Sequence, residues 1–296
     1  MVSTITFFIF MKRISTIIDN LGEQFGVWFS RALIVLVLGL IFFVTIGGIS
    51  HNSKWQILRV EVSGAKAVSG EMIRTLALDK ILGSYFLVYA RNNSYIFPVG
   101  DIEQSLLGTF PRIESAEVRR VNDHSIVINI SERKPYALWC GTEFSPEMYT
   151  LNDCWFIDEL GYIFDKSPIF SKGVYMEVYG KLLERNSGEP LRSSLPFDRF
   201  VHANSFSKLL RENVGKVSRI EILPEGELDV VVDGSSEYPF LVETKLRFKD
   251  DSNLDILLKN LTSAIPVQFP ENYALKKKLL YIDMRFGNKV IFGFEN

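Results

Sequence analysis

The sequence predicts an α+β protein that is attached to a membrane by a single N-terminal helix. Three features predict this class: one long uncharged apolar run near the N-terminus, many short segments in which apolar and polar residues alternate, and a few segments with helical apolar spacing. The chain has 296 residues, 47% of them hydrophobic and 23% charged, with a formal charge of −2. Such a composition is typical of an ordered globular protein, and without a basic excess we expect no nucleic-acid partner.

The apolar run from Ala32 to Ile49 contains no charged residue, and Thr45 is its only residue with a polar side chain. At about 1.5 Å per residue it makes a helix of about 27 Å, close to the roughly 30 Å hydrocarbon core of a bilayer. Trp28 and Trp55 flank the run, as aromatic residues often do at membrane interfaces. A cleaved signal peptide is the alternative, but its apolar core is usually shorter and nearer the start. We therefore predict a transmembrane helix over 32–49 and a tail over 1–31.

Basic residues favour a cytoplasmic N-terminus. Lys12, Arg13 and Arg31 precede the apolar run, whereas only Lys54 and Arg59 follow it closely. By the positive-inside rule this small excess places the tail in the cytoplasm and the rest of the chain outside it.

Residues 55–133 have the pattern of a β-α-α-β-β domain. Alternating residues predict a strand over Ile57–Ala65, and Ser69 is a candidate N-cap for the first helix. Asp101 is a candidate N-cap for the second helix, which Pro111 ends. A loop over 79–100 separates the helices, and two further strands are expected at 115–121 and 125–131.

Residues 134–296 predict a mostly antiparallel β-rich domain with two helices. The expected strands lie at 136–140, 154–158, 162–164, 174–179, 217–223, 227–232, 240–243, 278–285 and 289–294, and the expected helices at 197–211 and 253–265.

The two cysteines, Cys140 and Cys154, both follow the apolar run. A disulfide is possible only outside the cytoplasm, and their spacing suits facing positions on a hairpin with a long connection. Two unpaired buried thiols are the alternative interpretation.

No motif in the chain indicates catalysis. A Ser-His-Asp set in a recognisable context, a GxSxG turn and a glycine-rich phosphate loop are all absent from the sequence. The histidines are too scattered for a metal cluster. We expect no catalytic residue, metal, cofactor or small-molecule substrate. A membrane-tethered enzyme and an envelope-assembly factor are the alternatives.

The last expected strand points to a binding role. It places Val290, Phe292 and Phe294 on one face, and Ile291 with Gly293 on the other. A strand near a chain end is often a sheet edge, and a partner strand can satisfy its open backbone groups. The alternative is an internal strand that helices cover on both faces.

Five segments carry a resemblance to a known family. They read VEVSG, FPRIESAEVRR, INISERKPYALW, FIDELGYIF and YIDMRF, and their shared residues include Val60, Val62, Gly64, Pro111, Ile113, Ser115, Ala116, Val118, Arg120, Ile130, Glu132, Arg133, Pro135, Ala137 and Trp139. In this order they resemble the FtsQ/DivIB family of bacterial cell-division proteins. The long loop before Gly100 and the segment 141–153 depart from the family pattern.

The resemblance implies a polypeptide-transport-associated (POTRA) domain over 55–133 and a family-specific β domain over 134–296. It implies a non-enzymatic, single-pass scaffold in the plasma membrane at the division septum, which binds FtsB/DivIC-like and FtsL-like partners. It also implies partner contacts at Phe286 and Phe294. Tyr281, Asp283 and Arg285 belong to the same motif, and we include Tyr281, Arg285, Val290 and Phe292 with those two as candidate partner-binding residues.

Overall fold

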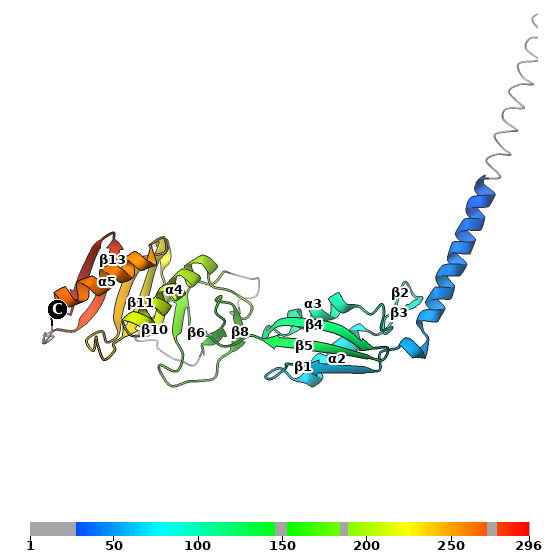
Figure 1. Ribbon diagram of the computed structural model, residues 1–296, viewed down its shortest axis with the longest axis horizontal. Coiled ribbons are helices and arrows are strands. Elements are labelled where there is room, and N and C mark those ends of the chain that lie inside the picture. Colours follow the sequence, from blue (N-terminus) through cyan, green and yellow to red (C-terminus); the bar gives the residue numbers. More distant parts are fainter. Residues whose placement is uncertain (1–27, 146–152, 184–188, 271–276, 296) are drawn as a thin grey trace, which may run out of the picture. The chain divides into compact units, whose positions relative to one another are not determined.

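The computed structural model describes residues 28–145, 153–183, 189–270 and 277–295 (Figure 1). These residues form two compact units. The first extends to Leu106 and includes Ala116–Ile130, and the second contains Leu107–Ser115 and the chain from Ser131 onward. Most of the expected tail over 1–31 lies outside the described residues.

One described helix is long and apolar enough to cross a membrane. It covers Trp28–Ser50, 23 residues with a mean hydropathy of 2.8, and so extends beyond the predicted 32–49 on both sides. Its length is about 34 Å at about 1.5 Å per residue. Among the described residues, almost none of the side chains of this helix are buried, so its apolar surface is exposed.

The first unit also contains most of a three-stranded sheet and of two helices, in the predicted β-α-α-β-β order; only the ends of α3, β4 and β5 fall in the second unit. The strand order is β1-β5-β4, and β1 runs parallel to β5. The elements are η1 (Ser53–Trp55), β1 (Arg59–Ser63), α2 (Gly70–Lys80), α3 (Val99–Thr109), β4 (Ile113–Asn122) and β5 (Ser125–Glu132). Their buried side chains include Val60, Ile73, Ala77, Ile102, Leu106, Ile126 and Ile128.

Two predictions for this unit were incomplete or wrong. α3 begins at Val99, so Asp101 lies in its first turn and is not its N-cap. The expected loop over 79–100 contains a hairpin of β2 (Ser84–Tyr85) and β3 (Tyr89–Ala90). Strands of two residues are too short to give a periodic pattern, so sequence reasoning missed them.

The second unit is built on a nine-stranded sheet with the order β14-β13-β12-β11-β10-β9-β6-β7-β8. Its pairs are mostly antiparallel, as predicted, but β6 with β9, β9 with β10 and β12 with β13 are parallel. The strands are β6 (Ala137–Trp139), β7 (Trp155–Ile157), β8 (Ile163–Lys166), β9 (Glu177–Gly180), β10 (Lys216–Ile222), β11 (Glu227–Asp233), β12 (Thr244–Lys249), β13 (Leu279–Phe286) and β14 (Lys289–Phe294). The short helix η3 (Pro224–Gly226) makes the turn between β10 and β11.

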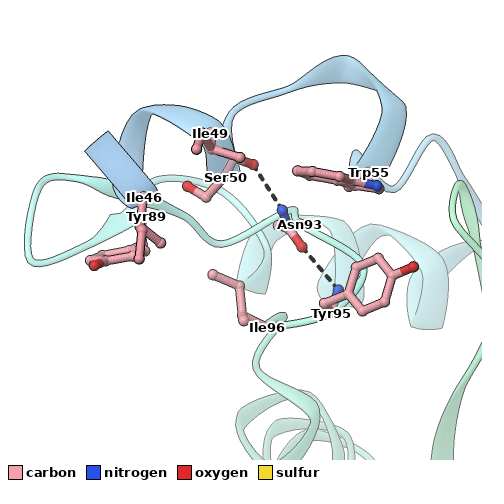
Figure 2. Close-up of a pocket in the computed structure, with 8 residues that line it drawn as sticks. All are labelled: Ile46, Ile49, Ser50, Trp55, Tyr89, Asn93, Tyr95 and Ile96. Atoms are coloured by element: carbon pink, nitrogen blue, oxygen red, sulfur yellow. Dashed lines mark hydrogen bonds between the residues drawn. The ribbon is translucent and has the colours of Figure 1, made fainter. Parts of the chain in front are cut away.

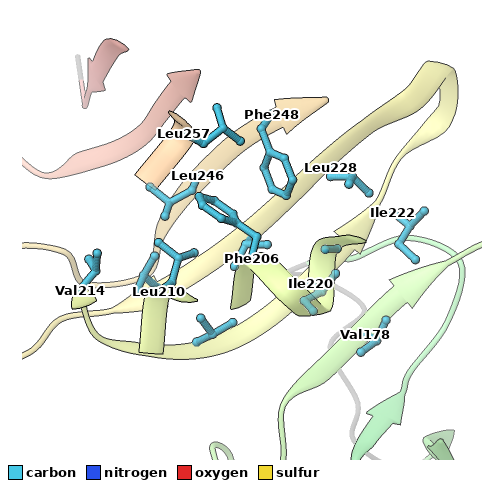
Figure 3. Close-up of a cluster of buried hydrophobic side chains, with 14 of the residues drawn as sticks. Val178, Phe206, Leu210, Val214, Ile220, Ile222, Leu228, Leu246, Phe248 and Leu257 are labelled. Carbon is cyan, nitrogen blue, oxygen red and sulfur yellow. The ribbon is translucent and has the colours of Figure 1, made fainter. Parts of the chain in front are cut away.

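Two helices, α4 (Phe197–Asn213) and α5 (Leu254–Gln268), pack on one face of this sheet (Figure 1). In the core beneath them, Phe206 of α4 packs edge-on against Phe248 with 4.8 Å between ring centroids (Figure 3). Asn253 caps α5, because its Oδ1 accepts a hydrogen bond from the N–H of Ile256 at 3.1 Å. The opposite face of the sheet carries charged side chains.

The strand predicted over 240–243 was wrong, and β12 forms at Thr244–Lys249 instead. Its Leu246 and Phe248 face the core. On the other face, Lys245 forms ion pairs with Glu221 of β10 and Asp229 of β11, and Arg247 forms one with Asp229. A run of charges looks like a solvated loop in a single sequence. The acidic partners lie on β10 and β11, so they cannot be recognised from the residues next to this segment in the sequence.

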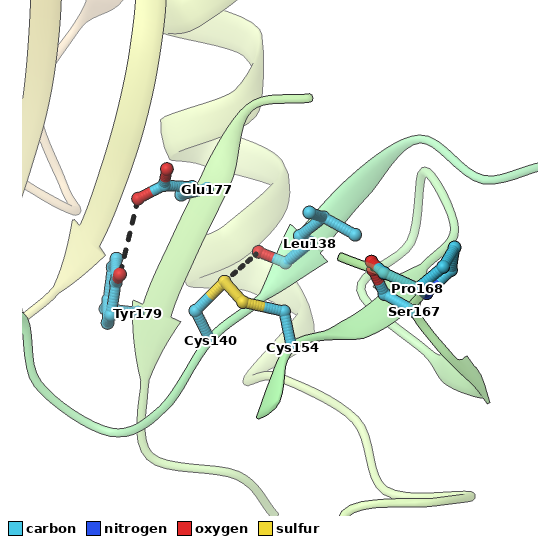
Figure 4. The surroundings of a disulfide bond; sticks show 7 residues. All are labelled: Leu138, Cys140, Cys154, Ser167, Pro168, Glu177 and Tyr179. Carbon is cyan, nitrogen blue, oxygen red and sulfur yellow. Dashed lines mark hydrogen bonds between the residues drawn. A yellow bond between two sulfur atoms is a disulfide. The ribbon is translucent and has the colours of Figure 1, made fainter. Parts of the chain in front are cut away.

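The structure joins Cys140 and Cys154 by a disulfide, with their Cα atoms 4.2 Å apart (Figure 4). Trp139 and Trp155 are cross-strand partners in the antiparallel pair of β6 and β7. The cysteines occupy the next positions along these strands, so they face each other as a hairpin requires. Of the two alternatives, the structure has the bonded pair.

Candidate partner-binding edge of the large sheet

The strand β14 lies at one end of the nine-stranded sheet. In the described part of the chain it pairs with β13 and has no neighbouring strand on its other side. The predicted edge position is therefore confirmed, and the alternative of an internal strand is wrong.

The backbone of β14 presents hydrogen-bonding groups along this open side. The N–H of Glu295, just beyond the strand, donates to the carbonyl of Lys278 at 2.9 Å, toward β13. Alternate residues of an antiparallel strand direct their backbone groups to opposite sides. We therefore expect the N–H groups of Val290, Phe292 and Phe294 to point outward, where a further strand can pair with them.

The side chains of these three residues turn toward the core and are half-buried. The ring of Phe269, at the C-terminal end of α5, contacts Phe292 and Phe294 with centroid distances of 5.5 and 6.2 Å. The predicted alternation along the strand is thus correct. These side chains support the edge from beneath, and their role in binding a partner stays a prediction.

The sheet face opposite the helices carries an exposed apolar strip beside the edge, made of Tyr281, Phe286 and Ile291. Their exposed fractions are 38%, 54% and 44%. Two of the three were predicted as site residues, but Ile291 was not. The sequence could have indicated Ile291, because it is the one large apolar residue of β14 on the face opposite Val290, Phe292 and Phe294.

Gly293 allows the strip to pack closely. It is the cross-strand partner of Tyr281, and a Cβ atom at this position would overlap the tyrosine ring. The ring therefore lies over the glycine, which is a common way for an aromatic residue to cover a glycine in an edge strand.

Arg285, another predicted site residue, is held in place by two carboxylates. Its guanidinium bonds Asp283 at 2.6 Å and also forms an ion pair with Glu227 of β11. These hydrogen bonds and charges raise the pKa of Arg285 further above its ordinary value. Burial works against ionisation of Asp283, but the hydrogen bonds and charge of Arg285 outweigh it and lower the pKa of Asp283.

A second cation lies one strand away. Arg247 makes two hydrogen bonds of 2.9 Å to the fully buried carboxylate of Asp229, which raise the pKa of Arg247. Sequence reasoning missed this residue. The sequence could have indicated it through the alternation of charged with apolar residues across 245–249. This alternation is informative only if the segment is taken to be a strand.

The edge thus combines open backbone groups, exposed apolar side chains and cations that carboxylates hold in place. Within the described ranges, no group of three or more His, Cys, Asp or Glu residues is placed to hold a metal ion.

Comparison with known proteins gives no family model that matches this chain and no match among curated proteins.

Proposed function

We propose that this protein is a membrane-anchored scaffold that binds a partner by adding the partner's strand to β14. The open edge of β14 carries the proposal: it is six residues long, and Lys289 is its only charged residue. An exposed apolar edge promotes aggregation unless another chain covers it. A partner strand would satisfy the backbone groups, and the apolar strip beside the edge would select its side chains.

We further propose that the scaffold is a cell-division protein of the FtsQ/DivIB type, as the sequence resemblance implies. Its partners are then FtsB/DivIC-like and FtsL-like bitopic proteins, and it helps to position septal cell-wall synthesis. The order of elements in the first unit supports this proposal. So does the position of Tyr281, Arg285 and Phe286, the residues of the family motif, beside the open edge.

The proposed location is the plasma membrane at the division septum, with the N-terminus in the cytoplasm. The helix Trp28–Ser50 provides a span of sufficient length. The disulfide between Cys140 and Cys154 supports an extracytoplasmic second unit, because disulfides persist mainly outside the cytoplasm.

The test is capture of the FtsB/DivIC-like and FtsL-like proteins of the same organism by the full-length chain in lipid nanodiscs. Val290→Pro removes an outward N–H while the strand can stay in place, because proline is tolerated on edge strands where its N faces solvent. Ile291→Lys adds a charge to the apolar strip. We expect each change to weaken capture at least tenfold.

The matched control is Val267→Lys, which puts the same charge at an exposed apolar position of α5 and should leave capture unchanged. Capture by both edge variants equal to that of the control would refute strand addition at β14. Failure of the unchanged chain to capture either partner would instead refute the division-complex assignment.

A further inference from the structure

The hairpin of β2 and β3 carries two large apolar side chains at its tip. The N–H of Val88 donates to the carbonyl of Tyr85 at 3.0 Å and closes a tight turn. Its central residues, Phe86 and Leu87, have positive φ angles of 48° and 63°. Asn, Asp and Gly are the residues that usually occupy such positions. Here Phe86 and Leu87 are 83% and 96% exposed, so the turn displays apolar surface in place of the polar residues it favours.

The hairpin lies against the last turns of the helix Trp28–Ser50. The hydroxyl of Tyr89 donates to the carbonyl of Phe43 at 3.2 Å, and the two rings pack edge-on at 4.9 Å. The side chain of Val88 fills the space over Gly47, where a Cβ atom would overlap it. Since Phe43 precedes Ser50 by about two helical turns, the contact lies about 10 Å inside the helix end.

Polar contacts fix the base of the hairpin to the end of the helix. The hydroxyl oxygen of Ser50 accepts a hydrogen bond from the N–H of Ala90 at 2.9 Å. A ring nitrogen of His51 lies 2.9 Å from the carbonyl of Val88. The amide nitrogen of Asn93 donates to the carbonyl of Ser50 at 2.9 Å (Figure 2).

An apolar pocket of about 370 Å³ lies at this junction (Figure 2). Ile46 and Ile49 of the helix line it together with Trp55, Tyr95 and Ile96. Tryptophan and tyrosine are enriched where a membrane meets water. The pocket therefore continues the apolar surface of the helix onto the segments that follow it in the chain.

We propose that the hairpin Ser84–Ala90 enters the lipid leaflet at the C-terminal end of the helix and places Phe86 and Leu87 among its acyl chains. This inference rests on the membrane span of the proposed function. With the apolar stretch of the helix in hydrocarbon, the contact of Tyr89 with Phe43 puts the hairpin at the depth of the outer leaflet. Lipid is the occupant because the hairpin is uncharged over its whole length and adjoins a helix whose apolar side chains are almost all exposed among the described residues.

The first charged residue after the hairpin fits this depth. Arg91 lies over the ring of Tyr85 at 5.1 Å and forms an ion pair with Asp101 at 2.8 Å. Its charge is thus held at the base of the hairpin, on the side of α3, and does not enter the leaflet.

The test places a single environment-sensitive dye on the full chain in lipid nanodiscs. The chain has two cysteines, which are bonded to each other, so one added cysteine is the only free thiol. Leu87→Cys reports on the hairpin tip, and Leu38→Cys reports on the middle of the helix. Met72→Cys, at an exposed apolar position of α2, is the matched control for a water-facing site. Each is labelled with a nitrobenzoxadiazole dye and exposed to spin-labelled lipid or to aqueous iodide.

At Leu87 we expect quenching by spin-labelled lipid and at least fivefold weaker quenching by iodide than at Met72. Alkylation of the unlabelled cysteine at position 87 by a charged maleimide should also be at least tenfold slower than at position 72, which excludes an effect of the dye.

Iodide quenching at Leu87 equal to that at Met72 would overturn the inference, provided that the dye at Leu38 is quenched by lipid. Protection at Leu87 from both quenchers would also overturn it, in favour of a second copy of this chain as the occupant. If the dye at Leu38 is not quenched by lipid either, the membrane span of the proposed function fails as well.

Discussion

The two edges of the nine-stranded sheet differ in whether another segment of the chain covers them. At the β8 edge the strand has four residues, and its Ile163 and Phe164 are buried. The N–H of Ile163 donates to the carbonyl of Ser193 at 2.9 Å. The carbonyl of Ile163 accepts a hydrogen bond from the N–H of Arg192, also at 2.9 Å. The chain therefore covers this edge with its own backbone. At the other end, β14 has six residues and a free side among the described residues.

This difference is the basis for proposing β14 as the edge that a partner strand joins. Proteins protect exposed edges with short strands, charges, bulges or covering segments. The β8 edge has a short strand and a covering segment, and the nearby disulfide fixes the hairpin of β6 and β7 beside it. The β14 edge has one lysine and two irregularities in its pairing with β13. Among the described residues no further segment covers it, which supports the proposal that a partner strand pairs there.

The largest expected effect comes from removing the disulfide near the covered edge. Replacing Cys140 and Cys154 together by serine opens a loop with a sequence separation of 14. A loop of this size constrains the unfolded chain by about 3 kcal/mol, so the free energy of unfolding should fall by that amount. Denaturant titration measures it, and the reduced wild type is the control. An unchanged midpoint would show that the covered edge does not depend on the bond.

A somewhat smaller loss is expected at the open edge from Phe292→Ala. Replacing a fully buried phenylalanine by alanine costs about 3–5 kcal/mol, and this ring is half-buried, so we expect a loss of about 2 kcal/mol. Phe197→Ala, at an exposed position of α4, should change stability by less than about 0.5 kcal/mol. Equal effects of the two changes, measured by thermal unfolding, would mean that β14 is not supported by the core.

The third prediction concerns acid stability. Because the pKa of Asp283 is lowered in the folded state, its contribution is present above the unfolded value of about 3.9 and is lost as the pH falls through the folded value. Asp283→Asn should cost about 1.5 kcal/mol at neutral pH, since hydrogen bonds to a charged group are of this size. Its free energy of unfolding should also decline less steeply below about pH 4 than that of the wild type. Parallel acid profiles would contradict this assignment.

The smallest effect on stability is expected from Lys289→Ala, which removes the charge that guards the open edge. Stability should change by less than about 0.5 kcal/mol, because the side chain is exposed. Self-association should nevertheless increase, because a charged side chain hinders pairing between edges. Light scattering measures it, with Lys249→Ala on β12 as the control. Equal association of both variants would show that Lys289 does not protect the edge.

Local patterns in the sequence were sufficient for much of the fold. The apolar run, the two helices over the large sheet and the final strand pair were predicted because each has a strong period or a clear turn signal. The alternation of Val290, Phe292 and Phe294 with Ile291 was likewise readable from the sequence. The hairpin with Phe86 and Leu87 and the charged strand β12 were missed. Their stability depends on contacts with distant segments, namely the N-terminal helix and the acids of the neighbouring strands.

By itself the sequence determined which residues can be buried, where the chain can turn and which segment is apolar enough to cross a membrane, because these properties depend on neighbours within a few residues. Only the tertiary structure decided which edge of the sheet stays open, that Cys140 bonds Cys154, and that the hairpin lies along the helix. Strand order and such pairings join residues that are far apart in the chain. They are fixed by the packing of complete elements, and no local pattern encodes them.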